Sequence, residues 1–201
     1  MSLKTSYRFI APLYDAILDR AIADGVRRRS FASLMQMERS RVLIGGAGTG
    51  LDFPFLPSQH EYTALDLSAE MQQRSRDRAL GLDMAWVRGD SMALPFAPAS
   101  FDHAVLHLIL AVVPRPPLCL AETARVLKPG GRIFLFDKFL RRGERAWLRR
   151  ALNPLSMHIA TRLDVVFEDV LDEVPELRMV SDRPALGRGW FRLIELQKRE
   201  V

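Results

Sequence analysis

The sequence lacks several features that would place it in particular classes of protein. Its single cysteine, Cys119, cannot form an internal disulfide. Its longest apolar run, residues 104–113, is interrupted by His107 and falls well short of the roughly 20 residues that span a membrane. No repeat, low-complexity tract or linker divides the 201 residues, and the first residues lack the apolar segment of a signal peptide. We therefore expect a single cytoplasmic domain.

Positive charge is in modest excess. The net charge of +5 is carried mostly by arginine and favours anionic partners such as phosphate, nucleic acid or a membrane surface. Basic clusters lie at Arg27–Arg29 and across residues 138–150, and each can also be an ordinary solvated face. Aromatic residues are not interleaved with the basic ones, as they are in a nucleic-acid groove, so no nucleic-acid partner is expected.

Apolar stretches with strand character alternate with helical patterns along the chain. Ser68 is the expected N-cap of a helix, and Pro129–Gly131 is expected to end another. This alternation predicts an α/β fold in which a mostly parallel sheet has helices on both faces. Two final strands are expected to form an antiparallel pair near the sheet edge. Strands are expected at 41–45, 61–67, 83–89, 101–108, 132–139, 176–184 and 189–198, and helices at 51–56, 68–80 and 117–127.

A glycine-rich loop follows the first strand directly. Glycine destabilises ordered structure by roughly 0.5 to 1 kcal/mol, so three alternate glycines should permit either a positive φ or the close approach of a ligand to the main chain. Ligands of open parallel sheets bind beyond the carboxyl ends of the strands. The candidate site residues are therefore those that follow strands: Gly45, Gly46, Ala47, Gly48 and Gly50 in the loop, and Asp66, Asp90, His107 and Asp137.

Two nucleotide-binding interpretations compete for this loop. The dinucleotide pattern G-x-G-x-x-G fails because Leu51 stands where the third glycine is needed, which disfavours a nicotinamide dehydrogenase. Asp66 lies twenty residues beyond Gly46, at the end of the next strand, where its carboxylate can accept both hydrogens of a ribose diol. Asp66 can also be a simple neighbour of the helix N-cap. Together, the loop and the acid predict an adenosine-containing ligand.

Five motifs resemble, in order and spacing, those of the class I S-adenosylmethionine-dependent methyltransferases. They are "VLIGGAGTG", "YTALDLSAEM", "VRGDSMALPF", "FDHAVLHLILAVVP" and "ARVLKPGGRIFLFD", and the match spans residues 41–137. The resemblance implies a Rossmann-like sheet of seven strands with a terminal reversed strand pair, S-adenosylmethionine as the cofactor, and no metal.

The resemblance also implies roles for individual residues. The loop glycines would let the backbone approach the aminoacyl and ribose parts of the cofactor, and Asp66 would hold the ribose hydroxyls. Leu67 would pack on the adenine. Asp90, unless it is an ordinary loop acid, would accept from the adenine amine, with the backbone of Ser91 and Met92 alongside. Many relatives carry an acid at the position of Ile44, so a catalytically silent cofactor-binding protein stays an alternative.

His107 is the candidate general base, because it ends the fourth strand at the cofactor edge and imidazole titrates near neutral pH. A hydrogen-bonded structural histidine is the equal alternative, and His103 is interpreted as structural. The sequence "VPRPPL" stands where amide and base-amine methylases that resemble this chain carry "N/D-P-P-Y". A small or lipidic acceptor is therefore favoured.

The flanking segments narrow the resemblance. "YRFIAPLYDAI" resembles the opening of quinone-biosynthesis methyltransferases and of bacterial phosphatidylethanolamine N-methyltransferases, whose helix covers the cofactor. Tyr7 and Tyr14 would then border the pocket, unless they are core aromatics at helical spacing. The helix expected around Trp147, another pocket candidate, can either lie in a membrane interface or pack over the sheet as a lid.

We expect one methyltransferase domain over residues 1–201. Its parts are an N-terminal helical lid (1–40), a cofactor-binding core (41–137), a helical substrate cap (138–170) and a terminal strand pair (171–201). The first hypothesis for the acceptor is a phospholipid headgroup amine, with peripheral contact to anionic membrane at its inner face. A quinone precursor, methylated on carbon or oxygen, is the second.

Overall fold

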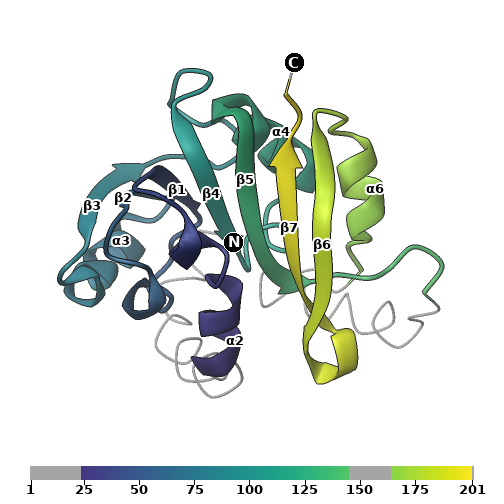
Figure 1. Cartoon of the computed structure of the whole chain (residues 1–201), viewed down its shortest axis with the longest axis horizontal. Helices are drawn as coiled ribbons and strands as arrows, with labels where there is room; N and C mark the ends of the chain where they lie inside the picture. Colours follow the sequence, from purple (N-terminus) through teal and green to yellow (C-terminus); the bar gives the residue numbers. More distant parts are fainter. Residues whose placement is uncertain (1–23, 145–163, 201) are drawn as a thin grey trace, which may run out of the picture.

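A seven-stranded sheet runs through the computed structural model, which describes residues 24–144 and 164–200 (Figure 1). The strand order is β3-β2-β1-β4-β5-β7-β6. The strands are β1 (Arg41–Gly45), β2 (Glu61–Asp66), β3 (Asp83–Arg88), β4 (Phe101–His107), β5 (Leu127–Lys138), β6 (Leu177–Leu186) and β7 (Phe191–Lys198).

The first five strands are parallel, whereas β7 runs antiparallel to both β5 and β6. The predicted fold class is thus confirmed, including the closing antiparallel pair. The first strand of the sheet is β1. The chain then adds β2 and β3 on one side of β1 and crosses over to add β4 on the other side. This reversal of strand order lies between β1 and β4, and a crevice at such a point is where open α/β sheets bind ligands.

Helical segments cover both faces of the sheet, because successive residues of a buried strand point to opposite sides. Val42 and Ile44 join the core cluster that contains Phe31, whereas Leu43 between them joins the cluster that contains Leu120 of the opposite layer. The helices are α2 (Asp24–Ser30), α3 (Ala69–Ser75), α4 (Pro116–Val126) and α6 (Phe167–Asp172), with 3-10 turns η1 (Leu34–Gln36), η2 (Phe53–Phe55), η3 (Arg76–Ala79) and η5 (Gly187–Gly189).

The three predicted helices differ from the elements that the structure shows. The helix expected at residues 51–56 is only the turn η2, and the helix expected at 68–80 is divided into α3 and η3. The third helix ends at Val126, because Leu127 already has extended backbone angles and pairs with Phe101 of β4. Pro129–Gly131 therefore lies inside β5 and does not end the helix. Ser68 is confirmed as an N-cap, since its Oγ accepts from the N–H of Met71 at 3.3 Å.

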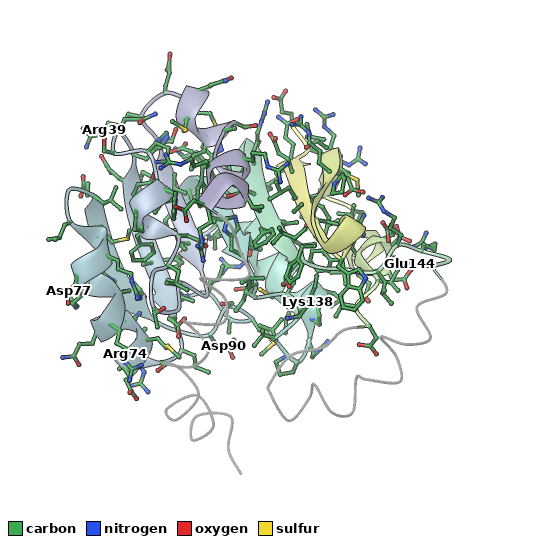
Figure 2. All side chains as sticks on the ribbon, turned by 90° about the horizontal axis from the view of Figure 1, so that it is seen from below. Arg39, Arg74, Asp77, Asp90, Lys138 and Glu144 are labelled. Carbon is green, nitrogen blue, oxygen red and sulfur yellow. The ribbon has the colours of Figure 1, made fainter. Side chains whose placement is uncertain are left out.

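The carboxyl ends of the parallel strands meet at the lower edge of Figure 1, where α2 and the η5 turn also lie. Figure 2 looks at this edge from below. Asp90 and Lys138 lie near the middle of the view, with Arg74 and Asp77 to one side and Glu144 to the other. Lys138 pairs with Phe191 in the sheet, so the start of β7 borders the same edge.

The division into lid, core, cap and strand pair stays a prediction, because residues 1–23 and 145–163 lie outside the described part. The described portion of the expected lid packs on the sheet, with Phe31 and Leu34 fully buried. No helix among the described residues is long and apolar enough to cross a membrane.

Candidate functional site

The glycine loop after β1 needs glycine for two separate reasons. Gly46, Gly48 and Gly50 all have positive φ, at 67°, 55° and 75°. A Cβ at Gly46 would also lie 2.5 Å from Ile109 Cδ1, and one at Gly50 would lie 2.8 Å from the ring of Phe53. A Cβ at Gly48 would meet nothing closer than the Gly46 carbonyl oxygen at 4.0 Å. The chain's own packing thus accounts for Gly46 and Gly50, and Gly48 alone leaves open space for a ligand.

This difference predicts unequal effects of two alanine substitutions. Gly46→Ala should destabilise the protein by about 3 kcal/mol, because left-handed strain of roughly 1–2 kcal/mol adds to the clash with Ile109. Gly48→Ala should show only the strain, yet should weaken binding of S-adenosylhomocysteine, because the added methyl fills the open space. Urea unfolding and calorimetric titration of both variants measure the two quantities. Equal losses of stability would contradict the assignment.

Asp66 fastens the loop to the end of β2. Its Oδ2 accepts from the N–H of Gly48 and its Oδ1 from the N–H of Ser68, both at 2.8 Å. Burial raises the pKa of this carboxyl, and the hydrogen bonds from Ser68, Gly48 and Leu67 oppose that shift. Each oxygen keeps a second lone pair for a diol. The neighbouring Leu67 is an apolar side chain that is 50% exposed. Asp66 therefore precedes the N-cap and also lies against the glycine loop, and its contact with a ribose stays a prediction.

The turn after β3 lies beside Asp66. The N–H of Gly89 donates to the carbonyl of Asp66 at 3.1 Å, and Oδ1 of Asp90 accepts from the N–H of Met92 at 2.8 Å. Asp90 Oδ2 has no hydrogen-bond partner in the part of the chain that the structure describes, so it can accept from a ligand amine. Ser91 is buried in the same turn. The structure thus brings together Gly48, Asp66 and the Asp90 turn, as predicted.

Ile44 belongs to the apolar core. Its side chain is 6% exposed and packs in the cluster that contains Val42, Val105 and Phe53. Gly45 next to it is also set by packing, since a Cβ there would lie 2.6 Å from Leu106 Cδ2. An acid at position 44 would need a polar partner, and the residues of this cluster are apolar. Isoleucine therefore fits the surroundings of position 44 better than an acid would.

His107 ends β4 and is held by an acid that the sequence analysis missed. Its Nδ1 lies 2.8 Å from Oδ2 of Asp52, and Oδ1 of Asp52 accepts from Nε of Arg27 at 3.2 Å. The imidazole stacks on Phe31, with centroids 5.0 Å apart, and meets Phe136 edge-on at 5.7 Å. Nε2 is buried with no hydrogen-bond partner among the described residues.

Electrostatics keeps the Asp52 carboxyl ionised. Burial by itself would raise its pKa, but the charges and hydrogen bonds of His107 and Arg27 outweigh burial and lower it. Arg27 is 3% exposed and comes from α2, so three distant segments meet at this point. Asp52 immediately follows "GTGL", and its position two residues after a ligand-binding loop was the only sequence signal for it.

Lys138 is a second residue that sequence reasoning did not assign. Burial lowers the pKa of its ammonium, and the adjacent Asp137 carboxylate only partly opposes this. No hydrogen bond or ion pair of the ammonium occurs within the described residues. Asp137 itself is buried, and its oxygens accept from the N–H groups of Ala111 and Lys138 at 3.0 and 2.8 Å. Asp137 thus holds the loop after β4.

The remaining predicted residues divide into two groups. His103 accepts from the N–H of Arg132 at 3.3 Å near the opposite end of β4, in agreement with a structural role. Tyr7, Tyr14 and Trp147 lie outside the described residues, and their pocket roles stay predictions. No cluster of three metal-ligating side chains occurs among the residues described here.

Comparison with known proteins defines the family. A methyltransferase-domain model matches residues 43–135. The phosphatidylethanolamine N-methyltransferase of Cereibacter sphaeroides is 30% identical over 183 residues, covering 89% of each protein. The ubiquinone/menaquinone biosynthesis C-methyltransferase UbiE of Ruegeria sp. (strain TM1040) is 35% identical over 142 residues, covering 65% of this chain and 56% of that protein. The chain belongs to the class I S-adenosylmethionine-dependent methyltransferases. It is an enzyme, and its cofactor is S-adenosylmethionine.

Solved structures agree with this fold. The CurJ carbon methyltransferase superposes with a TM-score of 0.73 at 15% identity, covering 97% of this chain and 61% of that one. The [4+2]-cyclase SpnF superposes with a TM-score of 0.77 at 16% identity, covering 99% and 96%. The same fold therefore occurs in proteins with different activities, so the fold alone does not identify the acceptor of this enzyme.

The observed site fits this cofactor. Open space at Gly48 leaves room beside the loop, Asp66 offers lone pairs for the ribose diol, and Asp90 Oδ2 can accept from the adenine amine. Leu67 is exposed next to Asp66, where an apolar ring can pack. His107 Nε2, which has no partner among residues 24–144 and 164–200, lies at the end of β4, on the other side of β1 from Asp66.

Proposed function

We propose that this methyltransferase acts on the amine of a phospholipid headgroup, and that His107 takes the proton that the amine must lose. When bound, the cofactor supplies a methyl group made electrophilic by its sulfonium. An alkyl ammonium has a pKa near 10, so at neutral pH its nitrogen has no lone pair until a base removes a proton. The observation that carries the proposal is the buried Nε2 of His107 at the carboxyl end of β4, without a partner in the described residues.

Lys138 supports an acceptor that carries phosphate. His107 pairs with Phe136 in the sheet, and Lys138 follows Phe136 by two residues. Residues i and i+2 of a strand share a face and lie roughly 7 Å apart, so Lys138 lies one step beyond His107 toward the edge. A phosphodiester would give the half-buried ammonium an anionic hydrogen-bond partner, which no described residue supplies. Phosphate and amine of such a headgroup are separated by a short linker, which suits this spacing.

Similarity to relatives supports the same choice. The chain covers 89% of the length of the relative named for phosphatidylethanolamine, but only 56% of the length of the UbiE relative. A quinone precursor remains the second candidate, because that relative is more identical where it aligns. For a ring carbon, His107 would remove a proton only after methyl transfer. Contact of the 138–160 segment with membrane stays a prediction, since residues 145–160 lie outside the described part.

A methyl-transfer assay on an acceptor panel tests the proposal. The panel contains vesicles of phosphatidylethanolamine with phosphatidylglycerol, free ethanolamine, phosphoethanolamine and a demethylated quinone in detergent. Transfer to the phosphatidylethanolamine vesicles is expected, with little transfer to free ethanolamine. Transfer to the quinone alone, or to no member of the panel, would refute the proposed acceptor.

Lys138→Met provides the matched substitution for this assay. Loss of a charge-assisted contact worth about 1.5–3 kcal/mol should raise KM for the phosphate-bearing acceptor by about tenfold or more. The control is Lys128→Met, at the other end of β5, where the ammonium bonds Asp102. This control should leave KM unchanged. Equal KM values for the two variants would remove Lys138 from the acceptor site.

A further inference from the structure

Three polar side chains form a chain of contacts that ends at His107 Nε2, for which the described residues offer no hydrogen-bond partner. Arg27 of α2 donates to Oδ1 of Asp52 at 3.2 Å, and Oδ2 of Asp52 lies 2.8 Å from Nδ1 of His107. Neutral imidazole carries one proton, on either Nδ1 or Nε2. An ionised carboxylate can only accept, so Nδ1 must carry the proton that lies between them. Nε2 is then left with a lone pair.

We propose that Asp52 is a positioning residue, held by Arg27, that fixes His107 in the Nδ1–H form and so turns a basic Nε2 toward the acceptor. This inference rests on the proposed role of His107 as base. Phe31 and Phe136 limit rotation of the ring, so the orientation of Nε2 is set by packing as well as by Asp52. The ionisable groups that interact with the ring are Asp52, with Arg27 behind it, and Asp137 of β5, which acts on it electrostatically.

The proton balance of the step is simple. The N–H bond of the acceptor ammonium breaks, its electron pair stays on nitrogen, and the proton forms a bond to Nε2. His107 then carries protons on both ring nitrogens, and its positive charge lies 2.8 Å from the Asp52 carboxylate. The proton returns to solvent before the next turnover.

A second histidine shows what is particular to His107. His60 also has one buried ring nitrogen, Nδ1, without a hydrogen-bond partner in the described part of the chain. Its Nε2, however, lies 3.0 Å from the backbone carbonyl of Leu34, and it precedes β2 at the amino edge of the sheet. One buried ring nitrogen without a partner therefore does not by itself indicate a catalytic histidine. His107 differs from His60 in having a carboxylate partner and in lying at the cofactor edge of the sheet.

Asp52→Asn is the informative substitution, because it preserves shape and removes charge. The side-chain amide has one accepting oxygen, whereas both of its neighbours donate. Arg27 can only donate, and its charge strengthens the bond it makes, so the amide oxygen is expected to face Arg27. The NH2 group then faces Nδ1 and forces the proton of His107 onto Nε2.

Nitrogen-15 NMR of the histidine rings in the full-length protein tests the tautomer without any acceptor. Near pH 8, wild-type His107 should show a protonated Nδ1 and an unprotonated Nε2, and Asp52→Asn should show the reverse or a mixture. His60 should keep its Nε2–H form in both proteins and serves as the internal control. An unchanged Nδ1–H form of His107 in Asp52→Asn would overturn the inference.

Kinetics on phosphatidylethanolamine vesicles tests the consequence. Asp52→Asn should lower kcat by about 10- to 100-fold with little change in KM. The loss should fall on kcat and not on KM, since the acceptor still binds while the base no longer presents a lone pair. A purely structural role would lower stability and leave kcat of the folded enzyme unchanged, which contradicts the inference. Should the tautomer change while His107→Gln retains full kcat, positioning by Asp52 stands and the proposed base is wrong.

Discussion

Arg192→Met is expected to lower the free energy of unfolding by about 3–5 kcal/mol, the usual effect of removing one partner from a buried ion pair. Arg192 is fully buried in β7. Its guanidinium bonds both oxygens of Asp182 at 3.1 and 2.9 Å, Glu168 at 2.7 Å and the carbonyl of Leu140 at 3.0 Å. It also lies 5.6 Å from the centroid of Phe167.

This residue joins elements that no other buried charge connects in the described part of the molecule. Asp182 belongs to β6, Glu168 to α6 and Leu140 to the segment after β5. Methionine fills a similar volume but leaves Glu168 without its guanidinium partner and leaves Asp182 with Arg141 alone. The edge hairpin and α6 should therefore loosen together. Arg192→Lys should show a smaller loss, because one ammonium cannot reproduce the planar fork of bonds.

The pH dependence of this effect has a definite sign. Burial alone would raise the pKa of Asp182, but Arg192 and Arg141 together lower it. A lowered folded-state pKa contributes stability that is present above the unfolded value, near 3.9, and is lost as the pH falls through the folded-state value. The difference in unfolding free energy between wild type and Arg192→Met should therefore narrow below about pH 4.

Urea unfolding of the wild type, Arg192→Met, Arg192→Lys and one control variant measures these effects. The control is Arg142→Met, whose guanidinium is exposed and pairs with the exposed carboxylates of Asp169 and Asp172. Exposed pairs contribute little, so this variant should stay close to wild type. If Arg192→Met and Arg142→Met unfold at the same urea concentration, the buried network does not stabilise the edge of the sheet.

Contacts between neighbouring motifs were predictable from sequence, and contacts between distant polar residues were not. The loop of Gly46 and Gly48 and the acid at Asp66 follow adjacent parallel strands, so topology alone places them together. Their hydrogen bond at 2.8 Å confirms that part of the prediction. Asp52 lies 55 residues from His107, and no periodicity links the two positions. Such a pair is defined only when α2, the loop and β4 pack together.

The reasons for the loop glycines were also only partly predictable. Close approach of the cofactor was one predicted reason, whereas in the structure Ile109 and Phe53 exclude side chains at Gly46 and Gly50. Positive φ was a correct expectation at all three positions, because it depends on the loop itself. Steric exclusion depends on residues elsewhere in the fold and was not visible. The predicted stop of α4 at Pro129–Gly131 was wrong for a related reason, because Leu127 pairs with Phe101 of β4 and ends the helix earlier.

Substitution of His107 by glutamine is expected to reduce kcat on phosphatidylethanolamine by about 10²- to 10⁴-fold, the usual contribution of a positioned general base. Glutamine can still bond Asp52, but it has no nitrogen that accepts a proton near neutral pH. S-Adenosylhomocysteine should bind His107→Gln as it binds wild type, whereas Asp66→Ala should bind it weakly. This contrast separates loss of the base from loss of the cofactor site.

The pH profile of His107→Gln distinguishes a missing base from a distorted site. Without His107, only amine that has already lost its proton can react, so the rate should rise about tenfold per pH unit toward the amine pKa near 10. The deficit relative to wild type should therefore shrink steadily as the pH rises. A deficit that is constant from pH 7 to 10 would mean that His107 acts by packing against Phe31 and Phe136. A kcat within threefold of wild type at pH 7 would remove it from the chemistry altogether.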